Sequence, residues 1–236
     1  MRMARSWFVS SMVLIVSAAT AAPGRAQQPV RPLEITISAH GGGAIFTEFL
    51  EQRVQGDEVL DGERELVAKS SPLIGGSISF SRWEMSEVRL GVDWTGTEIE
   101  YRDDSAIESD ELDEEGLADL HLVVAQLAVI RHLMPRDARV SPYLSLGVNV
   151  AVWTLDEQPG GAVGATEETQ VRFGATTGIG ARFAASPRMG LRIEIDRATV
   201  GNPFDGDSAY RVAGDTFDEP STVGVLRLMG GLSYTL

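Results

Sequence analysis

Most of this chain after residue 33 alternates between apolar residues and residues that are polar or glycine. At 88–97, one set of alternate positions reads Val, Leu, Val, Trp and the other reads Arg, Gly, Asp, Thr, Thr. Because successive side chains of an extended strand point to opposite faces, this period of two indicates strands with one apolar face. The pattern recurs at 142–154, 171–183, 191–196 and 226–236. We therefore expect an all-β fold.

Glycine is frequent on the polar face of these segments, as at Gly147, Gly178 and Gly180. A soluble sheet exposes its polar face to water and favours long Lys and Glu side chains there, whereas repeated glycine indicates a crowded interior. In a narrow transmembrane barrel the apolar face contacts lipid and the polar face lines the lumen. Inward glycines would then leave room for large inward arginines.

The connections between these segments are short and long in turn. Short turns are expected at 83–86, 135–138 and 186–188, and long loops at 46–70, 102–116, 155–168 and 201–220. Barrels of outer membranes have short periplasmic turns and long outer loops. The chain is therefore predicted to form an eight-stranded antiparallel up-and-down transmembrane β-barrel, with both termini on the periplasmic side.

The approximate strands are expected at 33–45, 71–82, 87–101, 117–134, 139–154, 169–185, 189–200 and 221–236. The pattern leaves the register of the fourth strand open, because Gln126 interrupts one apolar face and Arg131 the other.

The first residues have the pattern of a secretory signal. Arg2 and Arg5 precede an apolar stretch at 7–19, and Gly24-Arg25-Ala26 is a cleavage site with small residues. The apolar stretch is shorter than the roughly 18 residues that a membrane-spanning helix needs. We expect a signal peptide at 1–26, export to the outer membrane of a Gram-negative cell envelope, and one barrel domain at 27–236. There is no Cys for a lipid anchor, a disulfide or a thiolate metal site.

The net charge of −14 is concentrated in acidic segments at 51–65, 103–115 and 205–219. Nucleic acid is excluded as a partner, because binding to phosphates depends on Lys and Arg. The spacing of an EF-hand is absent, so no specific metal site is expected. The expected partners are outer membrane lipids and lipopolysaccharide, with divalent cations bound weakly at the acidic loops, and the barrel-assembly machinery during insertion.

Charged residues on the predicted inner face are expected to pair, because unpaired buried charges are costly. The expected lumen network is Glu34, Arg89, Asp93, Arg172, Arg182, Arg192, Glu194, Asp196 and Arg227. Within it, Arg182, Arg192 and Arg227 are predicted to pair with Glu194, Asp93 and Asp196 and to block the lumen. A structural role is favoured over contact with a ligand or ion.

Motifs of known enzymes are incomplete. His40-Gly41-Gly42-Gly43 matches a lipase oxyanion motif, but the only candidate for the required G-x-S-x-G, at 75–79, lacks the final Gly. No His has a Ser two residues later, as a lipid A deacylase requires. Acid-base chemistry by Glu194 and Asp196 stays an open alternative. We expect no enzyme, no catalytic residue and no cofactor.

Short motifs resemble the outer membrane protein A-type and W-type eight-stranded barrels, the porin-family-like β-barrel domains. The resemblance lies in the segments 141–147 (SPYLSLG), 178–182 (GIGAR) and 190–194 (GLRIE) and in the amphipathic last strand. Two features depart from that group. The last residue, Leu236, is not aromatic, and no peptidoglycan-binding domain follows, so cell-wall anchoring is not implied.

Three functions are compatible with these observations. The favoured hypothesis is a structural or surface-interaction protein with a narrow, plugged lumen, since eight strands enclose a space that side chains can fill. The resemblance also implies a channel or carrier for small or hydrophobic solutes, acting through a lateral opening or a pocket near Trp94 and Trp153. The third is a soluble, lipocalin-like exported binding protein.

Overall fold

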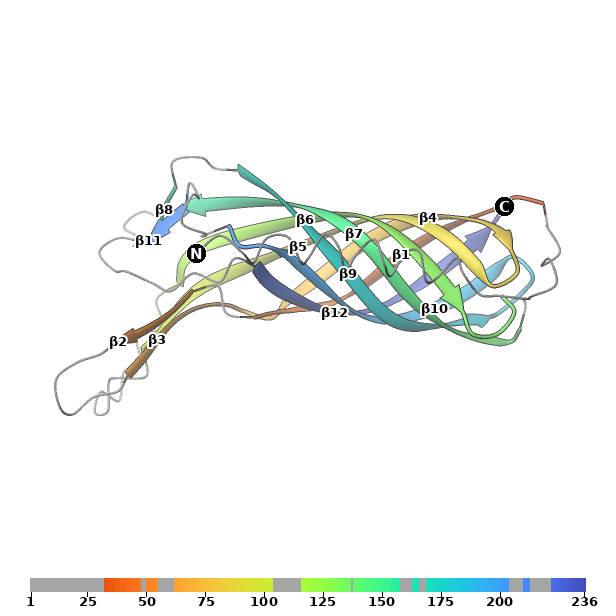
Figure 1. The fold of residues 1–236 in the computed structure, drawn as a ribbon, viewed down its shortest axis with the longest axis horizontal. Helices are drawn as coiled ribbons and strands as arrows, with labels where there is room; N and C mark the ends of the chain where they lie inside the picture. The colour runs from red at the N-terminus through yellow and green to blue at the C-terminus, as the bar shows by residue number, and fades with distance from the viewer. Residues whose placement is uncertain are drawn as a thin grey trace, which may run out of the picture.

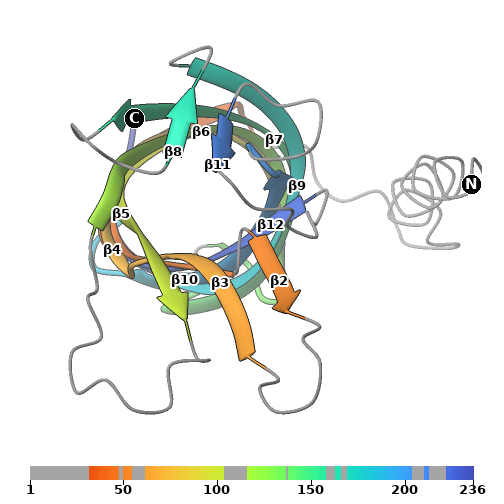
Figure 2. The ribbon, with the colours of Figure 1, turned by 90° about the vertical axis from the view of Figure 1, so that its left-hand side faces the viewer.

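Eight antiparallel strands close into a single barrel (Figures 1 and 2). The computed structural model describes residues 32–47, 50–54, 62–103, 116–136, 138–157, 163–165, 169–203, 210–212 and 222–236. The barrel strands are β1 (Glu34–Phe46), β4 (Ser71–Trp83), β5 (Ser86–Asp103), β6 (Gly116–His132), β7 (Val140–Glu157), β9 (Thr169–Ala184), β10 (Met189–Gly201) and β12 (Thr222–Thr235). In these residues no helix is long and apolar enough to cross a membrane.

Each strand pairs with the next along the chain, and the last pairs with the first. The β1 and β12 ladder runs from Thr36 opposite Thr235 to Phe46 opposite Val225, and β5 pairs with β6 to complete the ring. A closed ring leaves no open sheet edge among these eight strands. The expected strand number and order are confirmed, and every predicted strand end lies within three residues of the observed one.

Two further pairs of strands lie at one end of the barrel, which we call the extension end; one pair extends the barrel sheet and the other forms a separate two-stranded sheet. β2 (Leu50–Val54) pairs with β3 (Gly62–Ala68), and β3 continues along β5 beyond the barrel wall. β8 (Val163–Ala165) pairs with β11 (Tyr210–Val212). These four strands lie beyond the barrel in Figure 1. The prediction of loops at 46–70, 155–168 and 201–220 is therefore wrong at these strands. For β3, the long β5 provides a template that the acidic, turn-rich composition of the segment does not reveal.

The opposite end of the barrel, which we call the short-turn end, carries the tight connections and the C-terminus (Figure 1). The backbone of Leu236 donates to the carbonyl of Ile35, so the first and last barrel strands both meet this end. The expectation that both termini of the barrel lie on the same side is confirmed. The predicted signal peptide at 1–26 and most of the acidic loops lie outside the described residues.

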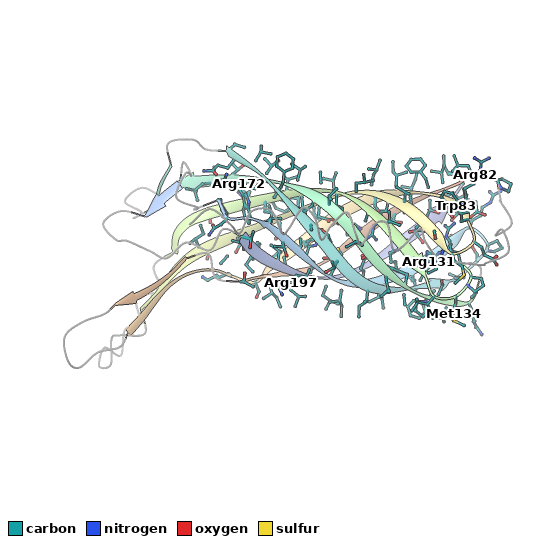
Figure 3. All side chains as sticks on the ribbon, in the orientation of Figure 1. Arg82, Trp83, Arg131, Met134, Arg172 and Arg197 are labelled. Carbon is teal, nitrogen blue, oxygen red and sulfur yellow. The ribbon has the colours of Figure 1, made fainter. Side chains whose placement is uncertain are left out.

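Apolar side chains point outward along the wall, and polar side chains point inward. On β7, Leu144, Leu146 and Val148 are 38% to 49% exposed, whereas Tyr143 and Asn149 are buried. The outward side chains surround the barrel along its length (Figure 3). The assignment of the two faces is confirmed on this strand.

The structure also settles the register of β6. Gln126 points into the lumen and is buried, whereas Leu127 and Val129 point outward and are 46% and 55% exposed. Arg131 lies on the outer face near the short-turn end, where its guanidinium donates to the hydroxyl of Ser86 (Figure 3).

The lumen has two layers of different chemistry. Toward the short-turn end it is filled with charged and polar groups. Toward the extension end it is filled with apolar side chains, among which Trp153 is completely buried and lies with its ring 6.4 Å from that of Phe46. The apolar layer consists of Ala44, Phe46, Leu73, Ile99, Leu120, Leu122, Val124, Ala151, Trp153, Leu155, Ala198, Val200, Val223, Val225 and Met229. The expectation of a polar inner face throughout is thus wrong for this half, where both faces of the wall are apolar.

Candidate functional site: the lumen charge network

The polar layer is centred on Arg227 of β12. Its guanidinium holds both oxygens of Asp196, with Nε at 2.6 Å and Nη2 at 2.8 Å, and donates through Nη1 to Asp93 at 2.6 Å. Nη2 also donates to the amide oxygen of Gln126 at 3.1 Å. His40 lies on the other side of Asp93, with Nε2 2.5 Å from the carboxylate. One arginine therefore joins side chains from four strands across the lumen.

A second arginine joins β5 to β10. Arg89 binds Glu194 through a bidentate pair at 2.5 and 2.6 Å, an arrangement that is strong because two parallel N–H donors match one carboxylate. Tyr143 and Ser145 donate to the same carboxylate at 2.8 and 3.1 Å. Glu194 thus receives four donors in a dry environment, which fixes its position.

A third cluster is organised by Glu87 near the short-turn end. Arg192 donates to Glu87 at 2.6 Å, and the Arg136 Nε lies 3.4 Å from the other carboxylate oxygen. Arg136 also reaches Glu34 at 3.1 Å. His132, which is completely buried, lies with Nε2 3.5 Å from Glu87.

Inward glycines make the room that these side chains need. A Cβ added at Gly75 would lie 2.1 Å from Asp93 and 2.5 Å from His40. One added at Gly180 would lie 2.4 Å from the Tyr143 ring. At these positions the space is used by Asp93, His40 and Tyr143, and not by the arginines that the sequence argument expected.

The predicted pairing is correct for Arg227 with Asp93 and Asp196, and wrong for the other two arginines. Arg192 pairs with Glu87, because Arg89 occupies Glu194. Arg182 points inward but donates to the backbone carbonyl of Arg136 at 3.1 Å and has no carboxylate within 4.0 Å among the described residues.

Arg172, also expected in the network, is half-buried toward the extension end (Figure 3). Glu34 joins the network only at its edge, where its side chain is 40% exposed. Neither belongs to the central clusters around Arg227 and Arg89.

Sequence reasoning did not place two charged residues and two histidines in the network. Glu87 and Arg136 lie at or within the turns, where alternation stops. His40 and His132 were considered only as catalytic residues. The inward position of Glu87 could have been found by continuing the polar face of β5 two residues back from Arg89.

Three neighbouring side chains have the order of a hydrolase triad, namely Ser141, His132 and Glu87. The Ser141 Oγ lies 2.9 Å from the His132 Nδ1, but it also donates to the carbonyl of Met134 at 3.0 Å. Ser141 and His132 are both completely buried. A substrate carbonyl cannot reach this hydroxyl. The hydrogen bonds of Ser141 instead hold the turn between β6 and β7 against the barrel wall.

Trp94 and Trp153, near which the sequence suggested a pocket or a lateral opening, lie on opposite faces of the wall. Trp94 points outward, is 43% exposed and stacks on His121 at 5.9 Å, whereas Trp153 is buried in the lumen. The described residues contain no cluster of three or more His, Cys, Asp or Glu arranged to hold a metal ion.

No family model and no curated protein matches this chain. Among solved structures, it is similar to the outer membrane protein OprG from Pseudomonas aeruginosa, with a TM-score of 0.57 and 13% identity over 90% of this chain and 99% of OprG. It is also similar to the outer membrane protein AlkL, solved in DMPC lipid bilayers, with a TM-score of 0.51 and 12% identity over 91% of this chain and 95% of AlkL. At these identities the likeness shows the fold, and it confirms an eight-stranded barrel of the outer membrane type.

Proposed function

We propose that this protein is an outer membrane barrel with a closed lumen, and that it has a structural or surface-interaction role. The belt of outward apolar side chains supports the membrane location. Phe173, Ile179 and Leu228 are 77%, 59% and 55% exposed, and an apolar surface that surrounds a protein marks contact with lipid. A soluble lipocalin-like carrier would need the opposite arrangement, with a polar outer surface.

Two successive layers of side chains in the lumen support the proposal. A hydrated ion would have to pass the charge network, in which Arg227 and Arg89 span the barrel from wall to wall. It would then have to cross the apolar layer around Trp153, whose apolar side chains cannot replace its hydration shell. Eight strands enclose a space that side chains fill, which favours a scaffold over a pore.

In the proposed orientation the short-turn end faces the periplasm and the extension end faces outward. The proposed partners are outer membrane lipids and lipopolysaccharide along the wall, and the barrel-assembly machinery during insertion. Weak binding of divalent cations is proposed for the acidic loops, most of which lie outside the described residues.

The location is tested by fractionation of cells that express the full chain. We expect the protein in the outer membrane, where it should migrate faster on gels before boiling than after, as a closed barrel resists the detergent. Recovery from the soluble periplasm would refute the membrane assignment.

Closure is tested in planar bilayers. Wild-type protein should give little or no steady conductance. A positive control weakens both layers by combining Arg89→Ala and Glu194→Ala, which leaves the net charge unchanged, with Trp153→Ala, and it should conduct more than the wild type. Large and stable channels from the wild type would refute closure and favour solute transport.

A second candidate function is the passage of small apolar compounds, which the apolar half of the lumen favours. Liposomes with the wild-type barrel would then admit an apolar dye faster than protein-free liposomes, while ions stay excluded. Equal rates with and without the protein would remove this candidate.

A further inference from the structure

A cavity of about 400 Å³ opens at the short-turn end of the barrel. Its wall combines the start of β1, the turn between β4 and β5, and the turn between β9 and β10, and Arg136 and Arg182 lie in it. This cavity lies on the short-turn side of the charge network, at the end that the proposed orientation places in the periplasm. None of the clusters around Arg227 and Arg89 contributes to its lining.

Arg182 is a buried cation with no carboxylate within 4.0 Å among the described residues. Its residue is only 7% exposed. Its single hydrogen bond goes from Nη1 to the backbone carbonyl of Arg136, and its buried Nε has no partner among the described residues. A buried guanidinium without an anion is costly, so the position favours a negative ligand.

The surrounding charges leave an excess of positive charge. The arginines that line the cavity are Arg82, Arg136 and Arg182, and the carboxylates that line it are Glu34, which is 40% exposed, and Glu84. Arg192 and Glu87 lie just behind the lining and pair with each other, so the excess is one positive charge. Arg136 is already paired with Glu34 and Glu87. Arg182 is therefore the buried guanidinium available to a ligand that enters the cavity.

A hydroxyl on the cavity wall adds a neutral donor. Ser186 accepts hydrogen bonds from the backbone N–H groups of Arg188 and Met189 at 3.3 and 3.0 Å. Because its oxygen is occupied as an acceptor, its own proton is available to donate to an anion. Trp83 also lines the cavity and is 46% exposed, next to Arg82 (Figure 3).

We propose that this cavity binds a small oxyanion of the phosphate class, held by the guanidinium of Arg182 with a contribution from the hydroxyl of Ser186. The planar fork of arginine matches two oxygens of a phosphate, which a point charge cannot do. The phosphate group can be free in the periplasm or belong to a lipid headgroup of the inner leaflet. The site is independent of whether the lumen conducts.

Two arms distinguish the sources of the phosphate. In the first, the purified full chain in neutral detergent is titrated with inorganic phosphate at constant ionic strength, and binding is followed by calorimetry. In the second, the protein is placed in nanodiscs with or without phosphatidic acid, and retained lipid is measured by native mass spectrometry. Saturable binding in the first arm identifies free phosphate as a ligand, and retention in the second identifies a lipid. Absence of both overturns the proposal.

The variants test Arg182 directly. Arg182→Gln should weaken the observed binding about tenfold, because the charge-assisted pair is lost. Arg131→Gln is the matched control, since Arg131 lies at the same end on the outer wall and does not line the cavity; its affinity should stay within about twofold. Equal affinities of Arg182→Gln and wild type overturn the proposal.

Glu34→Gln gives a second test that does not depend on the folding of Arg182→Gln. Removing the carboxylate on Arg136 raises the positive charge of the cavity, so binding should tighten by about threefold or more. A purely structural role of Arg182 predicts no such gain. An unchanged or weaker affinity of a Glu34→Gln protein that shows normal heat-modifiable migration would count against an anion site.

Discussion

Removing the central arginine of the lumen should be among the most damaging single changes in the barrel. Arg227→Met keeps most of the side-chain volume and removes the charge. Asp196 then loses every hydrogen-bond and ion-pair partner that the described residues offer it, while Asp93 keeps His40 and Gln126. Both carboxylates are 1% exposed, so water cannot replace the guanidinium.

The magnitude follows from leaving buried charge uncompensated. Breaking a buried ion pair by removal of one partner costs about 3 to 5 kcal/mol. Adding Asp196→Asn removes the carboxylate that lost all its partners, so the double variant should regain about 2 kcal/mol or more of the loss. Arg172→Met is the control, because Arg172 is half-buried and has no ion pair among the described residues; it should cost about 1 kcal/mol or less.

The assay is urea unfolding of the barrel in lipid vesicles, with the folded fraction measured on unboiled gels. The free energy of unfolding is obtained by linear extrapolation for all four proteins. The reasoning is refuted if Arg227→Met costs no more than Arg172→Met, and equally if Asp196→Asn fails to restore any stability to the Arg227 variant.

Three further changes test the wall and the apolar layer. Val148→Arg should lower the free energy of unfolding by about 2 to 4 kcal/mol if Val148 lies near the bilayer midplane, whereas Asn149→Ala should have a small effect. Equal free energies of unfolding for the two variants would show that the assignment of inner and outer faces is wrong. Gly231→Ala places a Cβ 2.4 Å from a backbone oxygen and should lower the midpoint of thermal unfolding, while Gly230→Ala has open space around it and should not; equal midpoints would contradict the wall geometry. Trp153→Ala should cost about 3 to 5 kcal/mol, and a loss below 1 kcal/mol in urea titrations would show that the apolar layer is loosely packed.

Local patterns were sufficient for the wall of the barrel. Whether Leu144 faces lipid and Tyr143 faces the lumen depends on the period of an extended chain, which is written in consecutive residues. The pattern fails where both faces are apolar, as in β6, in which inward Leu122 alternates with outward Val123. The apolar layer was missed for that reason, although the inward sequence Leu, Leu, Val at the start of β6 contained a signal.

Most partners of the charges were decided by the tertiary structure. Arg227 lies directly opposite Asp196 in a neighbouring strand, a pairing that the alternation made foreseeable. Its contact with Asp93, and the choice of Glu87 by Arg192, instead depend on which residues reach the same height across the lumen. That height is set by the stagger of all the ladders around the ring, which is a property of the closed barrel and of no single segment. The sequence by itself therefore determined the number of barrel strands and the two faces of the wall. Closure determined which charges meet, and it left Arg182 beside the cavity with no carboxylate within 4.0 Å among the described residues.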